Sequence, residues 1–448
     1  MDTPKLARYG VMVPSTEVVR KELTVRPIVN NEFGGQPPSF KVFRSSKKEK
    51  ANKMIYVPRY YHQGEVEDTR SEPVRCEIPF AGTLKKETHQ VEALEKAVSA
   101  GHGLLSLPCG YGKTTVALAI ASKLSYKTLV IVHKEFLANQ WRDRIQMFCP
   151  GVSIGLIQRD TVDTDHPFVI AMLQSLSMKD DYDPKLFDEF GTVIVDECHH
   201  ICAQVFSRAL FKMCPRHIFG LSATPIRKDG LSIVMEWFMG KPFFVVEREN
   251  RGKVSVSTVE YSCDRYKEDP PLNRCGKVSM STMITEIVED NIRNQVILNT
   301  IKSISHTRKI LVLSERREHC KYIAEHFGDE AGLYIGGMTQ KALDESSEKR
   351  IIVGTYSQAH EGLDIPSLDT LVMASPKSDI VQSIGRIMRE TNGKSNHPHI
   401  YDIRDRWSVI TGMIYKRNKV YRDKGFEIDQ DETPDEKPES GLSGFHFL

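Results

Sequence analysis

Short apolar runs recur along this chain, and longer segments with helical periodicity separate them. Each run has four to six residues rich in valine and isoleucine, and amphipathic segments such as residues 115–124 lie between them. Short buried strands that alternate with helices are typical of a doubly wound parallel sheet. The pattern therefore predicts an α/β fold with two parallel-sheet domains. The first series of runs spans residues 104–107, 128–132, 168–173, 192–195 and 218–221, and the second spans 309–313, 350–354 and 370–374.

The segments outside this pattern set the expected domain boundaries. Prolines such as Pro14, Pro37 and Pro73 break any long helix in the first 80 residues, which we interpret as a small accessory domain. The turn-forming sequence Asp269-Pro270-Pro271 favours a connection between the two α/β domains. We therefore expect an N-terminal accessory domain at residues 1–80, α/β domains at 81–255 and 284–425, a linker at 256–283 and an acidic, flexible tail at 426–448.

The composition is that of a globular protein with more than one domain. The chain has 448 residues, of which 27% are charged and 40% hydrophobic, and no apolar run approaches the length of a membrane span. Nine cysteines without regular spacing do not form a disulfide framework. We therefore expect no membrane association and a reducing intracellular compartment, such as the cytoplasm, the nucleus or, for a viral protein, the viral factory or virion. The formal net charge of +2 does not by itself indicate nucleic-acid binding.

A candidate phosphate-binding loop follows the first predicted strand and opens a helix. Gly110 and Gly112 allow a tight turn in which backbone N–H groups can surround phosphate oxygens. Lys113 would neutralise the β- and γ-phosphates, and the hydroxyl of Thr114 would bind Mg²⁺. Leu107 stands where the general pattern of such loops has a glycine. The loop predicts a nucleotide site.

Two carboxylates follow the buried run at residues 192–195. Asp196 and Glu197 come at the carboxyl end of that predicted strand, the edge at which open parallel sheets bind ligands. Asp196 can hold Mg²⁺, and Glu197 can orient and deprotonate the water that attacks the γ-phosphate. Together with the phosphate loop, the pair predicts nucleoside triphosphate hydrolysis.

Further segments occur in an order that resembles the motifs of superfamily 2 helicases. Asp196-Glu197-Cys198-His199 is similar to motif II, and residues 132–141 and 220–230 are similar to motifs Ia and III. In the second domain, residues 311–314, 354–364 and 382–389 are similar to motifs IV, V and VI. The resemblance covers residues 84–389. It is closest to the branch that contains XPB, the phage UvsW helicase and the poxvirus transcript-release helicase.

This resemblance implies two tandem RecA-like domains, ATP and Mg²⁺ as cofactors, and roles for further residues. Arg386 and Arg389 lie three residues apart, hence on one helix face, and would stabilise charge on the γ-phosphoryl group. With Lys113, Glu197 and Gln382 they form the expected catalytic set. The implied nucleotide contacts are Gln90, Gly110, Gly112, Lys113, Thr114, Thr115, Asp196 and Asp364; the coupling residues are His199, Ser222 and Thr224; and the nucleic-acid contacts are His133, Lys134, Gln174, Ser175, Arg227, Ser314, Arg316, Thr355 and Ser357.

The resemblance also implies a substrate. It favours single-stranded or forked DNA, 3′ to 5′ movement and ATP-driven unwinding or remodelling. A duplex translocase or annealing enzyme, a transcript-release factor, and an RNA helicase or enzyme of RNA–DNA hybrids remain alternatives. A binding module without ATPase activity is a further alternative, disfavoured because Lys113, Glu197 and Arg386 are all present. We expect residues 1–80 to be where a polymerase or another transcription or replication protein binds.

Overall fold

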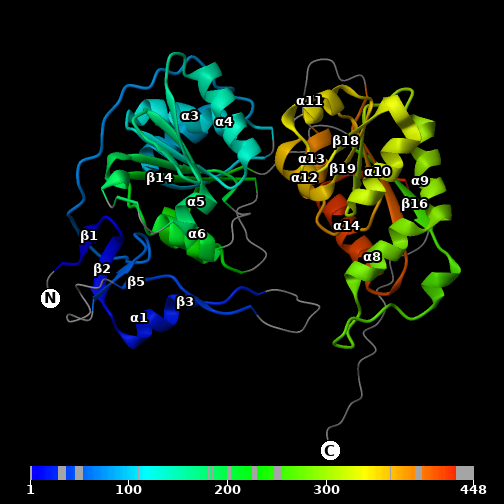
Figure 1. The fold of residues 1–448 in the computed structure, drawn as a ribbon, viewed down its shortest axis with the longest axis horizontal. Coiled ribbons are helices and arrows are strands. Elements are labelled where there is room, and N and C mark those ends of the chain that lie inside the picture. Colours follow the sequence, from blue (N-terminus) through cyan, green and yellow to red (C-terminus); the bar gives the residue numbers. More distant parts are fainter. Residues whose placement is uncertain are drawn as a thin grey trace, which may run out of the picture. The chain divides into compact units, whose positions relative to one another are not determined.

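The computed structural model forms two compact units (Figure 1). The first contains Met1–Glu249 with Leu272–Val278, and the second contains Asn250–Pro271 with Ser279–Leu448. The residues that the structure describes are 3–28, 37–45, 54–108, 110–179, 182–183, 185–198, 203–223, 230–246, 254–363, 365–388 and 396–429.

The first unit is built on an eight-stranded sheet. Its strand order is β11-β10-β12-β9-β13-β14-β8-β15, and every neighbouring pair is parallel except β10 with β11. All five apolar runs of the first series lie in or overlap these strands, which confirms the predicted parallel sheet. The strands are β8 (His102–Ser106), β9 (Thr128–Val132), β10 (Ile154–Gln158), β11 (Thr161–Asp163), β12 (Phe168–Met172), β13 (Thr192–Val195), β14 (His217–Ser222) and β15 (Pro242–Val245).

The central strands of this sheet are buried on both faces. Along β9, Leu129 and Ile131 belong to one hydrophobic cluster, whereas Val130 and Val132 belong to another. This period of two sends alternate side chains to opposite faces, which helices must cover. Figure 1 shows α3 and α4 on one side of the sheet and α5 and α6 on the other. The helices are α2 (Gln90–Ala100), α3 (Lys113–Leu124), α4 (Glu135–Phe148), α5 (Leu173–Met178), α6 (Ala203–Leu210) and α7 (Ser232–Met239).

The N-terminal extension has a small sheet of its own but shares the core of the first unit. Val11 and Ile55 lie in the same hydrophobic cluster as Leu210 of α6 and Phe238 of α7. The extension therefore packs on the α6–α7 side of the large sheet. Its sheet has the order β5-β6-β2-β1-β7. Its elements are β1 (Lys5–Ala7), β2 (Gly10–Pro14), α1 (Glu17–Glu22), β3 (Thr24–Val25), β4 (Phe40–Lys41), β5 (Arg44–Ser45), β6 (Met54–Val57) and β7 (Glu67–Asp68).

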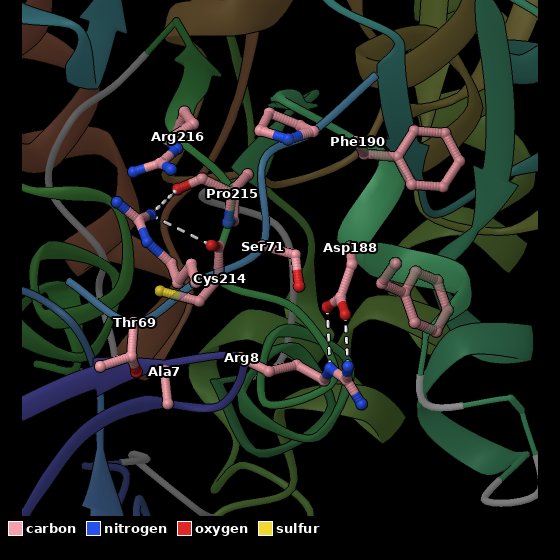
Figure 2. A pocket seen from close by; sticks show the side chains of 12 residues that line it. Ala7, Arg8, Thr69, Ser71, Asp188, Phe190, Cys214, Pro215 and Arg216 are labelled. Atoms are coloured by element: carbon pink, nitrogen blue, oxygen red, sulfur yellow. Dashed lines mark hydrogen bonds and ion pairs between the residues drawn. The ribbon is translucent and has the colours of Figure 1, made fainter.

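Arginines bind the extension to the amino-terminal edge of the large sheet, around a pocket of about 200 Å³ (Figure 2). Arg8 Nε donates to Asp188 Oδ1 at 2.7 Å, and Arg70 donates to the carbonyl oxygen of Cys214 at 3.1 Å. Arg216 forms ion pairs with Asp68 and with a second carboxylate of the extension. The pocket is thus a seam in which these arginines are matched by carboxylates and carbonyl oxygens.

The second unit has a seven-stranded sheet in which every pairing is parallel. Its order is β18-β19-β17-β20-β21-β16-β22. The second series of apolar runs forms β17, β19 and β20, as predicted. The strands are β16 (Ser255–Tyr261), β17 (Ile310–Ser314), β18 (Ala331–Tyr334), β19 (Ile351–Thr355), β20 (Thr370–Met373), β21 (His399–Asp405) and β22 (Glu427–Ile428), and the helices are α8 (Met280–Glu289), α9 (Asn291–Ile304), α10 (Arg317–Phe327), α11 (Gln340–Glu348), α12 (Tyr356–Gly362), α13 (Val381–Ile387) and α14 (Thr411–Asp423).

Two predicted boundaries of the second domain are wrong. Residues 256–261, which we assigned to the linker 256–283, belong to β16 and pair with β21 along its whole length. Residues 427 and 428, which we assigned to the tail 426–448, form β22 and pair with β16. Val256 is fully buried, so β16 contributes to the core of this unit. The turn at Asp269-Pro270-Pro271 lies beyond this strand and does not mark the start of the domain.

Candidate nucleotide site and nucleic-acid face

The phosphate loop lies between β8 and α3, as the sequence predicted. Gly110 and Gly112 have φ angles of 85° and 76°, in the left-handed region that favours glycine. A Cβ atom on Gly112 would lie 2.5 Å from Nε2 of Gln90, so a larger residue would clash with it. Gly112 is the N-cap of α3, and a helix N-terminus with free backbone N–H groups is suited to bind phosphate.

Two side chains fix the shape of this loop from opposite sides. Lys113 Nζ donates to the carbonyl oxygen of Leu107 at 3.2 Å, which connects the two ends of the loop. The amide of Gln90 accepts from Lys85 N and donates to the carbonyl oxygen of Tyr111, both at 2.9 Å. Gln90 therefore supports the loop in this structure, and its contact with the nucleobase stays a prediction.

Thr114 and Thr115 lie in the first turn of α3 and are partly exposed. Their position beside Lys113 keeps both hydroxyls at the helix N-terminus, where the predicted nucleotide contacts are. The structure thus brings the expected residues Gly110, Gly112, Lys113, Thr114 and Thr115 together in one loop and helix start.

Asp196 is buried at the carboxyl end of β13. Its backbone N–H donates to the carbonyl oxygen of Ile131 on the neighbouring strand at 3.0 Å. Its side-chain Oδ1 accepts from the backbone N–H of Glu197 at 2.9 Å, and Oδ2 accepts from Nε1 of Trp141 at 2.8 Å. The carboxylate is therefore held in one orientation by two donors.

The surroundings of Asp196 suit a cation. Burial, followed by the nearby Glu197 anion, raises the pKa of Asp196 to about 6, while Trp141 and Lys113 act in the opposite direction. A divalent cation would offset the cost of burying this carboxylate beside another one. The residues present therefore fit the Mg²⁺ that the resemblance implies, with Asp196 and the Thr114 hydroxyl as the candidate ligands.

Glu197 adopts a backbone conformation that is uncommon for a residue with a side chain. Its φ angle is 46°, in the left-handed region, and its side chain is half-buried. Such strained positions cluster at functional sites. The next residue, Cys198, donates through Sγ to the carbonyl oxygen of Leu221 at 3.4 Å. This contact connects the end of β13 to β14, next to the buried Ser222.

The predicted nucleic-acid contacts of the first unit follow β9 and β12, which pair in parallel. Gln174 Nε2 donates to the carbonyl oxygen of His133 at 2.8 Å, and Ser175 Oγ accepts from Arg159 N at 2.8 Å. Burial lowers the pKa of the neighbouring Lys134. The structure therefore brings His133, Lys134, Gln174 and Ser175 to the same edge of the sheet.

In the second unit, Ser314 does not lie where we expected it. Ser314 is fully buried, and its hydroxyl is hydrogen-bonded with Nδ1 of His319 at 2.9 Å and accepts from Arg316 N at 3.3 Å. A buried hydroxyl with these partners positions the chain and does not reach a phosphate. The Arg316 guanidinium donates to Ser281 and Thr285 of α8.

The other expected residues of the second unit lie at the end of β19 and in the first turn of α12, for the nucleic-acid contacts, and on α13, for the catalytic residues. The hydroxyls of Thr355 and Ser357 are 3.4 Å apart, and Ser357 is exposed. Arg386 is buried and donates to the carbonyl oxygen of Leu363 at 2.8 Å. Gln382 precedes Arg386 by one helical turn. The expected residues His199, Thr224, Arg227, Asp364 and Arg389 lie outside the described residues.

One residue of the site was missed. We placed Trp141 in a motif by resemblance but gave it no role, and the structure connects it to Asp196. The sequence has no local signal for this contact, because Trp141 lies in the second turn of α4 and Asp196 follows it by 55 residues.

Two family models match the chain. The type III restriction enzyme res subunit family matches residues 83–227, and the helicase conserved C-terminal domain matches residues 292–391. A predicted ATP-dependent RNA helicase of Acanthamoeba polyphaga mimivirus is 33% identical over 450 residues, covering 94% of this chain and 85% of that protein. A predicted ATP-dependent RNA helicase of African swine fever virus is 26% identical over 390 residues, covering 79% of this chain and 75% of that protein.

A solved structure has the same fold. The ATP-dependent type ISP restriction-modification enzyme LlaBIII, bound to DNA, aligns with a TM-score of 0.52 at 17% identity, covering 77% of this chain and 30% of that chain. The chain therefore belongs to the superfamily 2 helicases, which are nucleic-acid-dependent ATPases. Within that superfamily it groups with viral helicases. In the part of the chain that the structure describes, no helix has the length and apolar character needed to cross a membrane.

Proposed function

We propose that this helicase acts on single-stranded or forked DNA and moves 3′ to 5′ as it hydrolyses ATP. One observation supports DNA most directly: the family model that covers the nucleotide residues of the first unit and the His133–Ser175 edge is named for restriction enzymes, a class that acts on DNA. Backbone contacts would dominate the grip, because a motor must step along any sequence.

The chemistry follows from the positions of the first unit's side chains. The backbone N–H groups at Gly112 and the start of α3 would hold the phosphates, and Lys113 would release Leu107 to neutralise them. Glu197 would accept a proton from the attacking water. Mg²⁺, when bound by Asp196 and Thr114, would neutralise charge on the phosphate oxygens.

The roles of Gln382, Arg386 and Arg389 rest on the family resemblance. We propose that the two arginines stabilise charge on the γ-phosphoryl group, an effect of about 10³-fold or more in comparable reactions. The Arg386→Ala variant is expected to bind ATP and to hydrolyse it slowly. Equal turnover in this variant and in the wild type would contradict the assignment.

An RNA substrate is the second candidate, because two relatives are named as RNA helicases. ATP hydrolysis measured with single-stranded DNA, forked DNA, duplex DNA, single-stranded RNA and an RNA–DNA hybrid separates the candidates. Our proposal expects the largest stimulation by single-stranded or forked DNA. Stimulation by RNA alone would favour the second candidate.

A strand-displacement assay beside an annealing assay then separates unwinding from remodelling. Duplexes with a 3′ or a 5′ single-stranded tail test the direction. Displacement that needs a 3′ tail is the expected result. ATP-dependent annealing without displacement would instead indicate a remodelling enzyme.

Binding of a polymerase or another transcription or replication protein to residues 1–80 also stays a proposal. It is tested by variants that remove charged side chains from the exposed face of the extension.

The Glu197→Gln variant tests the hydrolysis step. We expect its DNA-stimulated turnover to fall about 10²- to 10⁴-fold, because it lacks the base while keeping the side-chain size. ATP binding and the melting temperature should be retained. Glu95→Gln, on the exposed side of α2, is the matched control and should leave turnover unchanged. Normal turnover in Glu197→Gln would refute the role of the base.

A further inference from the structure

Trp141 connects the predicted nucleic-acid edge of the first unit to the candidate Mg²⁺ ligand. Its indole Nε1 donates to Asp196 Oδ2 at 2.8 Å, and the two side chains are only 1% and 7% exposed. In so buried a place, removing the donor would leave part of the carboxylate without its hydrogen bond, which is costly. The contact therefore fixes the orientation of Asp196.

The segment between β9 and the second turn of α4 is attached to Asp196 at both of its ends. At one end, the backbone N–H of Asp196 donates to the carbonyl oxygen of Ile131 at 3.0 Å. At the other end, Trp141 donates to the side chain of Asp196. His133 and Lys134, the predicted nucleic-acid contacts, lie between these two hydrogen bonds in the sequence. If this segment shifts when nucleic acid binds, Asp196 must therefore either move with it or resist the shift.

Helix α4 is rigid enough to transmit such a shift. Leu137, Ala138 and Ile145 are buried in the same hydrophobic cluster as Trp141. The carbonyl oxygen of His133 also accepts from Gln174 Nε2, which fixes the segment on its other side. A packed helix between two contacts moves as one body.

From these contacts we infer that Trp141 is a positioning residue that holds Asp196 for Mg²⁺-bound nucleotide and couples this site to nucleic-acid binding at His133 and Lys134. The coupling half of this inference rests on the proposed function. The positioning half concerns only the first unit's own side chains. Residues that orient metal ligands typically change metal affinity by about 10- to 100-fold when they are replaced.

The first test is a Mg²⁺ titration without nucleic acid. Binding of a fluorescent ATP analogue is followed as Mg²⁺ is added to the wild type and to Trp141→Phe, which keeps an aromatic ring and loses the N–H donor. We expect the half-saturating Mg²⁺ concentration to rise about 10-fold or more in Trp141→Phe. An unchanged Mg²⁺ dependence would overturn the inference.

Trp407→Phe is the matched control. Trp407 is also 1% exposed, and its Nε1 donates to the carbonyl oxygen of Glu268 at 3.3 Å in the second unit. This variant loses the same group from an equally buried site and should keep the wild-type Mg²⁺ dependence. If Trp141→Phe does not fold, tryptophan emission decides. In a protein in which Trp237 and Trp407 are both replaced by phenylalanine, Trp141 is the remaining tryptophan, and its emission should change with Mg²⁺ at fixed nucleotide. A constant signal would contradict the positioning role.

The second test measures coupling. The affinity for a single-stranded DNA oligonucleotide is compared with and without the Mg²⁺ complex of a non-hydrolysable ATP analogue. By linkage, the ratio of the two affinities is the coupling factor between the sites. We expect Trp141→Phe to bring this factor close to one, and a factor equal to that of the wild type would overturn the coupling. A wild-type protein that binds neither DNA nor RNA would instead contradict the proposed function, and the Mg²⁺ titration would still decide the positioning role.

Discussion

Each sheet has a buried carboxylate at the carboxyl end of a central strand, and the two have different partners. Asp405, at the end of β21, accepts from Arg293 Nε and Nη2 at 2.7 and 2.9 Å, and neither side chain is exposed. Asp196, after β13, accepts from an indole and a backbone N–H. Asp405 thus has its own cation, whereas Asp196 has only neutral hydrogen-bond donors.

The same contrast extends over both units. Among the described residues, the buried arginines are Arg293, Arg386, Arg404 and Arg417, and all four belong to the second unit. In the first unit, two of the predicted nucleotide residues, Lys113 and Gln90, are held by hydrogen bonds to main-chain atoms. A buried carboxylate without an arginine is suited to receive a cation from a ligand. One with an arginine is already paired, and removing either partner of such a buried pair is destabilising.

The largest effect that this comparison predicts is the loss of stability in Asp405→Asn. The substitution leaves the Arg293 guanidinium buried and unpaired, which costs about 3–5 kcal/mol. Hydrogen exchange of β21 in urea should show this loss. The control is Glu318→Gln, which removes the exposed ion pair with Lys321 and costs about 0–1 kcal/mol. If the two variants are equally sensitive to urea, the buried Arg293–Asp405 pair stabilises the second unit no more than the exposed pair does, and the contrast with Asp196 is lost.

A second effect is a pH dependence that belongs to the second unit. Burial lowers the pKa of His319 from 6.5 to about 3, so the folded protein holds this ring neutral. Below pH 6.5 this histidine binds a proton in the unfolded chain but stays neutral in the folded chain. The free energy of unfolding therefore decreases as the pH falls towards 3. The free energy of unfolding should decrease by about 2 kcal/mol between pH 6.5 and pH 5.

The His319→Gln variant tests this assignment. Its stability should change less with pH over the same range, measured by hydrogen exchange of β17. His306→Gln, at an exposed position, is the control and should keep the wild-type slope. An equal slope in His319→Gln and the wild type would assign the pH dependence to other groups.

The third prediction has the opposite sign to the first. Because burial and Glu197 raise the pKa of Asp196 to about 6, its ionised form destabilises the fold at neutral pH. Asp196→Asn removes this cost and one hydrogen-bond acceptor, so we expect the first unit to gain about 1–2 kcal/mol at pH 7.5. The gain should diminish as the pH falls from about 6 to 3.8, the range over which the folded chain binds a proton that the unfolded chain does not bind, and below 3.8 Asp196 is mostly protonated in both states. Destabilisation at pH 7.5 would show that Asp196 is structural, like Asp405.

The sequence predicted the parts of this molecule that depend on local order. Apolar runs predicted both parallel sheets, and position relative to those runs placed Gly112 and Lys113 at the start of a helix and Asp196 at a strand end. It did not place residues 256–261 in the sheet of the second domain, because the pairing of that strand with residues about 140 positions later is specified by tertiary contacts. The inward direction of Ser314 and the Trp141–Asp196 contact were missed for the same reason. Polar residues after a strand share a pattern whether they face a ligand or a buried partner.

The smallest predicted change in nucleic-acid affinity concerns Ser314, where the resemblance and the structure differ. Ser314→Ala removes the hydroxyl between His319 and Arg316 N, which should cost the second unit about 1–3 kcal/mol because both partners are buried or part-buried. The oligonucleotide affinity of Ser314→Ala should stay within about twofold of the wild type, because the hydroxyl does not reach the surface. Lys134→Ala, in contrast, should weaken binding and reduce its salt dependence. Fluorescence anisotropy at two salt concentrations measures both. If Ser314→Ala instead loses as much affinity as Lys134→Ala, the strand ends of the second unit contact nucleic acid directly. The two units would then share this role.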